Sequence, residues 1–503
     1  MKNLSHQNIL VLGLGASGLA LARWCARCGA QVTVADTRPA PPQLASLQAS
    51  VPAAKFVTAA MDEALLEGAA FDLVLKSPGL SPASVSGVMA AAKARAIPCG
   101  NELSLFAQAL ADLKDEQAYA PKVIGITGTN GKTTVTSLTA QLVERAGKSV
   151  AVAGNIGPTL LDTLTEKLDG QAGDNAVALP EVWVLELSSF QLDGVSNFEP
   201  DVATVLNITQ DHLDWHETLP AYIAAKAHVY GSGGLMLLNR DDPLVMAALP
   251  AVVKGKQSRN YLTFGGGEPK RPGDYGIETV NGMAWLVRAA EADETIKRRK
   301  TEELVLHIQR LMPLEALRIQ GRHNATNALA ALGLAVAVGC TLAPMLHGLR
   351  EYRGEPHRVE SVAVLDGVEY FDDSKGTNVG ATVAALAGLG AERRLVLILG
   401  GEGKGQDFSP LADPVARYAR AVVLIGRDAP LIRKALQGLQ IELLDAASMQ
   451  QAVSMAAAQA RSGDAVLMSP ACASFDMFDN YEHRAEVFCD AVQALAVDQG
   501  AVL

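Results

Sequence analysis

The sequence lacks any apolar run long enough to cross a lipid bilayer. A membrane-spanning helix needs about 18 or more predominantly apolar residues, and no run in the 503 residues reaches that length. The segment "ILVLGLGASGLALA" after Lys2 resembles the apolar core of a secretory signal peptide. The spacing of its glycines is explained better by a ligand-binding turn. We therefore expect a cytoplasmic protein with no membrane span.

Cysteine is also scarce, with six residues in the whole chain. Disulfide frameworks are typical of short secreted chains with many cysteines, so this usage argues against one. Cys25 and Cys28 spell C-x-x-C, a spacing that redox and metal sites use. No second pair follows, and the segment has the pattern of an amphipathic helix. We predict that both are ordinary helix residues.

Basic residues are outnumbered, since 43 Lys and Arg face 54 Asp and Glu, for a net charge of −11. Binding to a nucleic-acid backbone needs a basic surface, so this balance opposes a nucleic-acid partner. Small anionic substrates need only local positive groups and stay open. The composition is globular, with 49% apolar and 19% charged residues. At about 100–200 residues per domain, the length indicates about three domains.

Short apolar runs alternate with helical patterns along the chain, which predicts three α/β domains built on largely parallel sheets. We place a Rossmann-like domain at 1–115, a central P-loop ATPase-type domain at 116–354 and a C-terminal Rossmann-like domain at 355–503. Residues 265–310 interrupt the pattern, are more polar and include the basic run "IKRRK". We expect this basic run to be a solvated insertion and not a binding patch.

The stretch "VIGITGTNGKTTVTSL", residues 123–138, has a strand pattern, a glycine turn and a helix pattern in succession. A standard P-loop has glycine five residues before its Gly-Lys-Ser/Thr, where this chain has Ile126. The context still predicts a phosphate cradle, because glycine lets backbone N–H groups approach phosphate oxygens and the helix start attracts anions. Lys132 would face the β- and γ-phosphates, and Thr133 would ligate Mg²⁺. The predicted cradle is Thr129, Asn130, Gly131, Lys132, Thr133 and Thr134.

Polar side chains follow two more strands of the central segment, at the sheet edge where open α/β folds bind ligands. Glu186 ends the run "VWVLEL", and a buried carboxylate needs a partner, which could be Mg²⁺ or an arginine. Lys226, in an alanine-rich helical stretch, reads by itself as a surface lysine. The run "TQDHLDWH" could hold zinc, although a phosphate loop favours a harder ion. Its candidate ligands are Asp211, His212, Asp214 and His216.

The N-terminal segment carries a G-x-G-x-x-G turn between a strand and a helix, from Gly13 to Gly18. Asp36 follows at about the spacing of the dinucleotide-binding fingerprint. Alone, this pattern favours an NAD-dependent dehydrogenase. A hydride-transfer enzyme does not need a second phosphate loop in another domain. Two nucleotide-type sites and a third α/β domain instead suggest that ATP energy joins a nucleotide-bearing substrate to a small molecule.

The phosphate loop "GITGTNGKTT" resembles the variant loop of the Mur ligases and folylpolyglutamate synthases. Further motifs similar to that family extend over almost the whole chain: "GNIG" (154–157), "LELSSFQL" (185–192), "NITQDHLDWH" (207–216), "GRHNATN" (321–327), "PHRVE" (356–360), "DDSKGTN" (372–378) and "SPACASFDMF" (469–478). Within the Mur ligases, the resemblance is greatest to the members that add D-glutamate to UDP-N-acetylmuramoyl-L-alanine. It implies a cytoplasmic, ATP-dependent ligase of peptidoglycan precursor synthesis.

The resemblance also implies roles for individual residues. The UDP portion would bind Ala16, Ser17, Asp36, Thr37, Arg38, Ser77, Pro78 and Gly79. Asn155 and His212 would meet the carboxyl end of that substrate. Adenine and ribose would contact Asn324, Arg358 and Asp373. D-Glutamate would bind Lys375, Thr377, Lys404, Ser474 and Tyr481.

Under the same resemblance Lys226 is carbamylated by CO₂ and joins Thr133, Glu186 and His212 around two Mg²⁺ ions. Two positions depart from the family's usual pattern, with Tyr481 where Phe is common and Glu402 where Asp is common. We expect a monomer. We also expect a hinge near Gly354, because the ATP loop and the residues that would bind D-glutamate lie in different domains. The alternatives are a sibling ligase for another amino acid, the dehydrogenase and a non-catalytic nucleotide-binding module.

Overall fold

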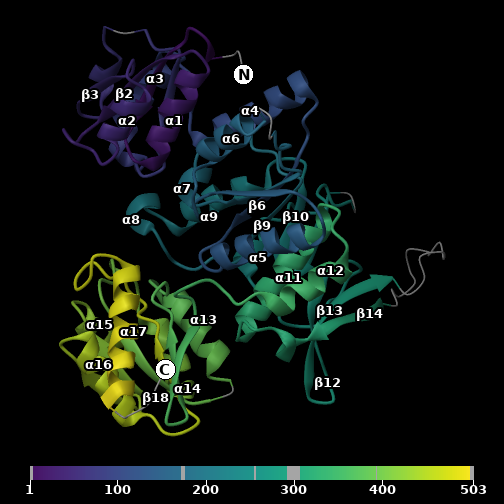
Figure 1. The fold of residues 1–503 in the computed structure, drawn as a ribbon, viewed down its shortest axis with the longest axis vertical. Helices are drawn as coiled ribbons and strands as arrows, with labels where there is room; N and C mark the ends of the chain where they lie inside the picture. The colour runs from purple at the N-terminus through teal and green to yellow at the C-terminus, as the bar shows by residue number, and fades with distance from the viewer. Residues whose placement is uncertain are drawn as a thin grey trace.

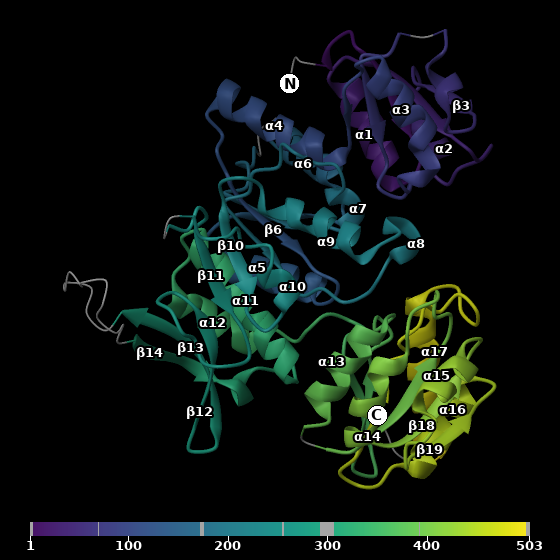
Figure 2. The same cartoon turned by 180° about the vertical axis from the view of Figure 1, so that it is seen from behind.

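The computed structural model describes residues 4–68, 70–171, 176–253, 256–291, 306–391 and 393–498. The chain forms three α/β lobes in sequence order, an N-terminal lobe, a central lobe and a C-terminal lobe (Figure 1). Each lobe has its own sheet covered by helices, so the predicted α/β class with three domains is confirmed. Figure 2 shows the C-terminal lobe below the N-terminal one, with the central lobe beside both.

The N-terminal lobe is a five-stranded parallel sheet in the order β3-β2-β1-β4-β5. Its strands are β1 (Asn8–Leu12), β2 (Gln31–Asp36), β3 (Lys55–Thr58), β4 (Leu73–Lys76) and β5 (Cys99–Gly100). Its helices are α1 (Ala16–Arg27), α2 (Leu44–Ser50) and α3 (Ser86–Ala94), with short 3₁₀ turns at Glu63–Leu66 and Ala83–Val85. Cys25 is buried in α1 and Cys28 ends that helix, which confirms that they are ordinary helix residues.

Close backbone packing explains one glycine of the N-terminal turn. A Cβ atom on Gly18, in α1, would lie 2.0 Å from the carbonyl oxygen of Gly13, so only glycine lets α1 start this close to β1. We expect Gly18→Ala to lower the free energy of unfolding by about 1–3 kcal/mol, because a backbone atom must move. Thermal and urea denaturation measure this loss. The matched control is Gly79→Ala, whose Cβ would meet no atom within 4 Å, and equal losses in both variants would contradict the steric explanation.

Helix α4 (Glu102–Gln117) leaves the N-terminal sheet and packs on the central lobe. A capping box starts it, in which the Asn101 side chain accepts from the Ser104 N–H and the Ser104 hydroxyl accepts from the Asn101 N–H. Phe106 meets Trp183 edge to face, with 5.1 Å between ring centroids. The N-terminal sheet therefore ends at Gly100, and α4 joins the two lobes.

The central lobe is a six-stranded parallel sheet in the order β11-β10-β9-β6-β8-β7. Its strands are β6 (Lys122–Thr127), β7 (Val150–Gly154), β8 (Val182–Glu186), β9 (Val202–Val205), β10 (Leu235–Asn239) and β11 (Tyr261–Phe264). Its helices are α5 (Lys132–Arg145), α6 (Leu160–Asp169), α7 (Ser189–Leu192), α8 (Leu213–His216), α9 (Leu219–Ala227), α10 (Pro243–Met246), α11 (Arg322–Ala337) and α12 (Leu342–Glu351). The strongly apolar β6 lies in the middle with β8 directly beside it, which sets their polar ends next to each other at the sheet edge.

The insertion at 265–310 is ordered where the structure describes it. Strands β12 (Tyr275–Val280), β13 (Met283–Glu291) and β14 (Leu306–Pro313) form an antiparallel sheet that buries Tyr275, Leu286 and Met312 against the central lobe. The less regular sequence pattern of this segment therefore conceals an ordered sheet. A register shift at Leu286/Val287 breaks the alternation of buried and exposed side chains that would have revealed the strands. The run "IKRRK" lies outside the described residues.

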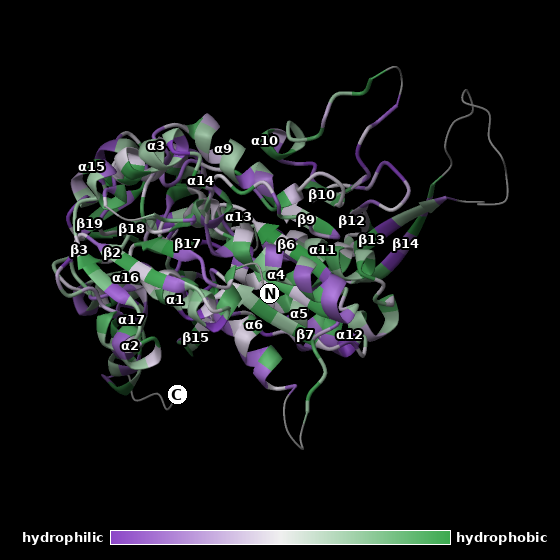
Figure 3. Cartoon of the chain, turned by 90° about the horizontal axis from the view of Figure 1, so that it is seen from above, coloured by the Kyte–Doolittle hydropathy of each residue, from purple (hydrophilic) through white to green (hydrophobic). Residues whose placement is uncertain are grey.

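The C-terminal lobe has six strands in the order β15-β16-β20-β17-β18-β19, all parallel except for the β15–β16 pair. Its strands are β15 (Glu360–Leu365), β16 (Val368–Asp372), β17 (Leu395–Gly400), β18 (Ala419–Ile425), β19 (Glu442–Asp445) and β20 (Ala465–Met468). Its helices are α13 (Val379–Leu389), α14 (Ala412–Tyr418), α15 (Ala429–Leu436), α16 (Met449–Gln459) and α17 (Tyr481–Asp498). Figure 3 shows apolar strands within each lobe. Among the described helices, none is both long and apolar enough to span a bilayer.

Candidate functional site

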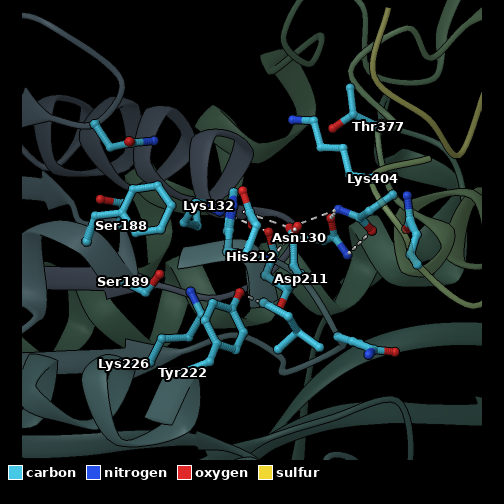
Figure 4. Close-up of a pocket in the computed structure, with 18 of the residues that line it drawn as sticks. Asn130, Lys132, Ser188, Ser189, Asp211, His212, Tyr222, Lys226, Thr377 and Lys404 are labelled. Carbon is cyan, nitrogen blue, oxygen red and sulfur yellow. Dashed lines mark hydrogen bonds and ion pairs between the residues drawn. The ribbon is translucent and has the colours of Figure 1, made fainter. Parts of the chain in front are cut away.

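A cavity of about 340 Å³ opens where the central and C-terminal lobes face each other (Figure 4). The central lobe lines it from the loops after β6, β7, β8 and β9 and from α9. The C-terminal lobe lines it from the segments around Arg358, Lys375 and Lys404. Many of the residues singled out in the sequence meet there: Thr129, Asn130, Gly131, Lys132, Asn155, Asp211, His212, Asp214, Lys226, Arg358, Lys375, Thr377 and Lys404. The cavity is therefore strongly polar, with several cations.

The loop between β6 and α5 forms one wall. Gly128 and Gly131 have φ angles of 157° and 82°, a region that side chains disfavour, so this turn requires glycine. The Lys132 ammonium donates to the carbonyl oxygens of Gly128 and Thr129, at 2.9 Å each. Burial lowers the pKa of Lys132, while Glu186 and Asp211 oppose this by attraction. The loop thus presents a confined cation beside a helix start, as phosphate binding requires.

Glu186 stands at the carboxyl end of β8, 1% exposed. Its Oε1 accepts a hydrogen bond of 2.7 Å from the Asn155 amide, and its Oε2 has no partner among the described residues. A buried carboxylate oxygen without a donor is costly, and a hard cation such as Mg²⁺ would satisfy it. Among the described residues, neither oxygen of the Glu186 carboxylate bonds to an arginine, so this site fits a magnesium ion better than the alternative ion pair with arginine.

Lys226, in α9, is 2% exposed, so the reading of this residue alone as a surface lysine is wrong. Its Nζ donates to the Gly128 carbonyl at 2.9 Å and lies 4.5 Å from the centroid of the Tyr222 ring. Burial and then repulsion from Lys132 hold the pKa of Lys226 well below its usual range. The amine is therefore biased toward its neutral, nucleophilic form, even though it faces an anion-binding loop.

Five rings from α7, α9 and the segment His212–His216 pack together as an aromatic wall: Phe190, His212, Trp215, His216 and Tyr222. Phe190 packs 4.7 Å from the His212 ring and 4.6 Å from the Trp215 ring. Desolvation lowers the pKa of His212, which favours the neutral imidazole. The sequence did not single out Phe190 or Tyr222 as lining residues, because helix periodicity cannot tell a cavity wall from a core.

The zinc alternative for this region is not supported. His216 bonds through Nε2 to the Ser189 hydroxyl at 2.9 Å and is packed inside the aromatic wall. Across the described parts of the chain, only His357, Glu360 and Asp372 bring three such ligand atoms within 4.8 Å of one another. In that group the His357 Nδ1 lies 2.6 Å from an Asp372 carboxylate oxygen, an ion-pair geometry that fixes the segment before Arg358.

The C-terminal lobe touches the phosphate loop directly. The Arg358 guanidinium donates to the Thr133 hydroxyl at 2.7 Å, and the Asn130 and Asn378 side chains bond each other at 3.2 and 3.3 Å. Asn378 lines the cavity but was missed in the sequence, since no local pattern indicates a contact 248 residues away. Two lobes that are separate in the chain thus share one polar network.

Lys375 lies over the ring of Tyr481, with Nζ 3.5 Å from the ring centroid. Burial and then repulsion from Arg358 lower the pKa of Lys375 to about 8, so the ammonium is present at neutral pH. Lys404 and Thr377 enter the cavity from the same lobe (Figure 4). Ser474 and Tyr481 do not line the cavity, but the Tyr481 ring contacts the lining residue Lys375.

A smaller pocket of about 100 Å³ adjoins the loop on the side of α11. Thr134, Asn324, Arg358 and Asp373 line it, together with Asn130 and Gly131, as expected for the adenosine end of a nucleotide. Burial raises the pKa of Asp373 to about 7. This pocket and the cavity share four lining residues, Asn130, Gly131, Arg358 and Lys375, so one extended ligand could fill both.

The residues predicted for the UDP portion form a separate group on the N-terminal lobe, at the carboxyl ends of β1, β2 and β4. Asp36 accepts from the Leu14 N–H at 2.8 Å and from the Arg38 N–H and guanidinium at 2.9 Å. The Arg38 hydrogen bonds hold the pKa of Asp36 well below its usual range. None of the following lines the cavity: Ala16, Ser17, Asp36, Thr37, Arg38, Ser77, Pro78 and Gly79.

Comparison with known proteins identifies the family. Family profiles match three consecutive parts of the chain: a MurD-like N-terminal domain at 7–99, the Mur ligase middle domain at 126–335 and the Mur ligase glutamate ligase domain at 357–472. A protein of Albidiferax ferrireducens, named UDP-N-acetylmuramoylalanine–D-glutamate ligase, is 67% identical over 505 residues, covering 100% of this chain and 99% of that one. The chain belongs to the Mur ligase family.

Other Mur ligases agree with this assignment and confirm the resemblance stated from the sequence. Proteins with the same name from Polaromonas sp. and Burkholderia thailandensis are 61% and 57% identical, covering 100% and 98% of this chain and the same shares of each relative. Among solved structures, MurF from Thermotoga maritima in complex with ADP aligns with a TM-score of 0.56 at 17% identity, covering 98% of this chain and 97% of that one. MurC from the same organism gives 0.51 at 19% identity, covering 97% and 100%. At these identities the structures show the shared fold.

Proposed function

We propose that this Mur ligase adds D-glutamate to UDP-N-acetylmuramoyl-L-alanine at the expense of ATP. The observation that carries the proposal is the single cavity in which Lys132 of the phosphate loop faces Lys375 and Lys404 of the C-terminal lobe. A phosphoryl donor on one side and an anionic amino acid on the other would then meet within one space. The names and full-length similarity of the relatives supply the substrates.

The proposed reaction has two steps, phosphoryl transfer and then amide formation. A carboxylate oxygen of the acyl substrate attacks the γ-phosphorus, the bond to the bridging oxygen breaks and ADP leaves, which gives an acyl phosphate. The amine nitrogen of D-glutamate then attacks the carbonyl carbon and loses a proton, and the tetrahedral intermediate expels inorganic phosphate. A bare carboxylate oxygen is a poor leaving group, whereas phosphate is a good one. Catalysis is therefore mainly positioning and neutralisation of crowded negative charges.

The residues of the cavity have distinct tasks in this scheme. The loop N–H groups and the Lys132 ammonium bind the phosphates, with adenosine in the smaller pocket beside Asn324. Asn155 and His212 orient the acyl carboxylate, and the neutral imidazole favoured at His212 avoids an additional buried charge. Lys375 and Lys404 bind the carboxylates of D-glutamate, with Thr377 beside them.

Two Mg²⁺ ions belong to the proposal, and the residues present fit them. Thr133, Glu186 and His212 offer ligand atoms, and the Oε2 of Glu186, which has no partner among the described residues, is the observation that best fits a bound cation. Lys226 would complete the set as a carbamate, which its depressed amine pKa favours. When bound, magnesium neutralises phosphate charge. The chain's own residues hold and orient the reactants.

UDP would occupy the N-terminal group around Asp36, so the acyl chain must extend from that lobe toward Asn155. This use of the glycine turn replaces the NAD site of the dehydrogenase alternative. We also propose a cytoplasmic monomer that binds no nucleic acid, which agrees with the net charge of −11.

An amino-acid panel tests the assignment. Phosphate release is measured with ATP, Mg²⁺ and UDP-N-acetylmuramoyl-L-alanine, first without and then with D-glutamate, L-glutamate, L-lysine or meso-diaminopimelate. We expect sustained release only with D-glutamate, together with formation of the amide product by mass spectrometry. Release with L-lysine or meso-diaminopimelate but not D-glutamate would assign the chain to a sibling ligase. Binding of ATP without release in any mixture would favour a non-catalytic module.

A further inference from the structure

A buried lysine crosses between the N-terminal and central lobes beside the aromatic wall. Lys76 is the last residue of β4 and directly precedes Ser77, Pro78 and Gly79, the residues proposed to hold UDP. Its side chain is only 9% exposed, and its Nζ lies 3.2 Å from an Asp193 carboxylate oxygen. The same Nζ lies 4.9 Å from the centroid of the Trp215 ring. Asp193 and Trp215 both belong to the central lobe, so one cation joins the lobes through two contacts.

The contact on Trp215 continues into the cavity. Trp215 stacks on Phe190 at 4.6 Å with an interplanar angle of 29°, and Phe190 meets His212 at 4.7 Å. Phe190 and His212 line the cavity, whereas Trp215 and Lys76 stand behind them. Side chains in successive contact therefore connect Lys76, on the UDP side of the N-terminal lobe, with the His212 imidazole, which would face the acyl carboxylate.

Packing is what positions Trp215. Its indole N–H is buried and has no hydrogen-bond partner among the described residues, so none of their polar groups sets the orientation of the ring. The cation of Lys76, Phe190 and His216 are its charged and aromatic neighbours, with His216 4.4 Å away. A desolvated cation on an indole face is an orienting interaction of considerable strength. Removing it leaves one face of the aromatic wall without support.

Other ion pairs between these lobes cannot serve this purpose. Arg23 pairs with Asp162 at 3.6 Å and Arg27 pairs with Asp169 at 2.7 Å, both along α1 and α6. Their side chains are 34–59% exposed, and surface pairs of this kind contribute little. They hold α1 against α6 and touch no ring of the aromatic wall. Lys76 alone among these cations joins the UDP segment to the wall.

We propose that Lys76 is a positioning residue that fixes the aromatic wall, and through it His212, relative to the UDP segment of the N-terminal lobe. The inference rests on the proposed function, because it concerns alignment of the UDP-linked acyl substrate. The acyl substrate is held at the UDP segment and at His212, and Lys76 sets the distance between these two points. The carboxylate of the substrate therefore reaches His212 in a productive position. ATP binds on the far side of the loop and does not depend on this contact.

The test compares Lys76→Met, Lys76→Arg and Asp193→Asn with the wild-type chain. Methionine keeps the length of the side chain without its charge, and arginine keeps both contacts available. We expect Lys76→Met to lower kcat/KM for UDP-N-acetylmuramoyl-L-alanine roughly tenfold to a hundredfold, since small misplacements of a reacting group are costly. The KM for ATP should stay within about twofold, and Lys76→Arg should restore most of the activity. Lys122→Met, which breaks the exposed pair with Asp201, is the matched control.

Fluorescence separates this inference from the proposed function, because it needs no turnover. The contribution of Trp215 to the emission is the difference between the spectrum of the wild-type chain and that of Trp215→Phe. In the ligand-free protein, this contribution should change in Lys76→Met but not in Lys122→Met. An unchanged Trp215 emission, or an unchanged kcat/KM, would overturn the positioning role. So would equal losses in the ATP and UDP-substrate parameters. A wild-type chain without ligase turnover that still shows the emission change would refute the proposed function while retaining the contact.

Discussion

Replacing Lys132 by alanine is expected to lower ligase turnover by at least about a thousandfold, equivalent to roughly 4 kcal/mol of transition-state stabilisation. The reason is electrostatic. The Lys132 ammonium is held at the turn of the phosphate loop by two carbonyl oxygens, beside the start of α5. Alanine removes the charge that we propose to face the transferring phosphoryl group and leaves the loop backbone intact. Phosphate release under saturating substrates measures the loss.

The design of this experiment includes two further variants. Lys148→Ala removes a partly exposed lysine beyond the other end of α5 and should keep nearly all activity. Lys132→Arg keeps the charge but cannot reproduce the compact ammonium, so turnover should remain low. Circular dichroism and thermal denaturation establish that each variant is folded. Full turnover of Lys132→Ala would mean that the phosphate loop has no part in the chemistry.

Replacing Lys226 by alanine or arginine is expected to lower turnover by at least about a hundredfold. Arginine keeps a positive charge but does not form a carbamate, so the pair of variants distinguishes a cation from a modified lysine. In the wild-type chain, incubation with ¹³C-bicarbonate should give one carbamate carbonyl signal by NMR that is missing from both variants. The Lys148→Ala variant should keep the signal.

The same signal should depend on pH in a defined direction. CO₂ reacts with the neutral amine, and burial lowers the pKa of Lys226, so the neutral form persists to a lower pH than in a free lysine. The carbamate signal should therefore persist to a lower pH than the carbamate of an unperturbed lysine, and it should fall as the pH drops through the depressed pKa. Wild-type turnover in Lys226→Arg, or a carbamate signal that survives in that variant, would exclude the modification at this residue.

Much of the site could be read from the sequence because parallel strands deliver their final residues to one edge. Glu186 and the loop around Lys132 each follow an apolar run, and the structure brings them to the centre of the same sheet edge. Local patterns also located Asp36 at the end of β2. These predictions succeed because strand direction and strand ends are local properties.

Other features could not be predicted because they depend on contacts between distant segments. The burial of Lys226 arises from the loop after β6, nearly 100 residues earlier in the chain. Asn378 meets Asn130 only after two lobes have docked. The sheet of the insertion was missed because a register shift and charged outer residues hide its alternation. In each case the deciding interaction is tertiary and leaves no mark on local composition.

The hydrogen bond from Arg358 to the Thr133 hydroxyl has a thermodynamic consequence. Thr133 is the residue that an incoming nucleotide would engage, so ATP must compete with an arginine contributed by another lobe. Occupancy of the nucleotide pocket and the displacement of that lobe are then linked equilibria, and such linkage acts equally in both directions. An amino acid that draws the C-terminal lobe into a particular orientation thereby changes the affinity for ATP, without contacting it.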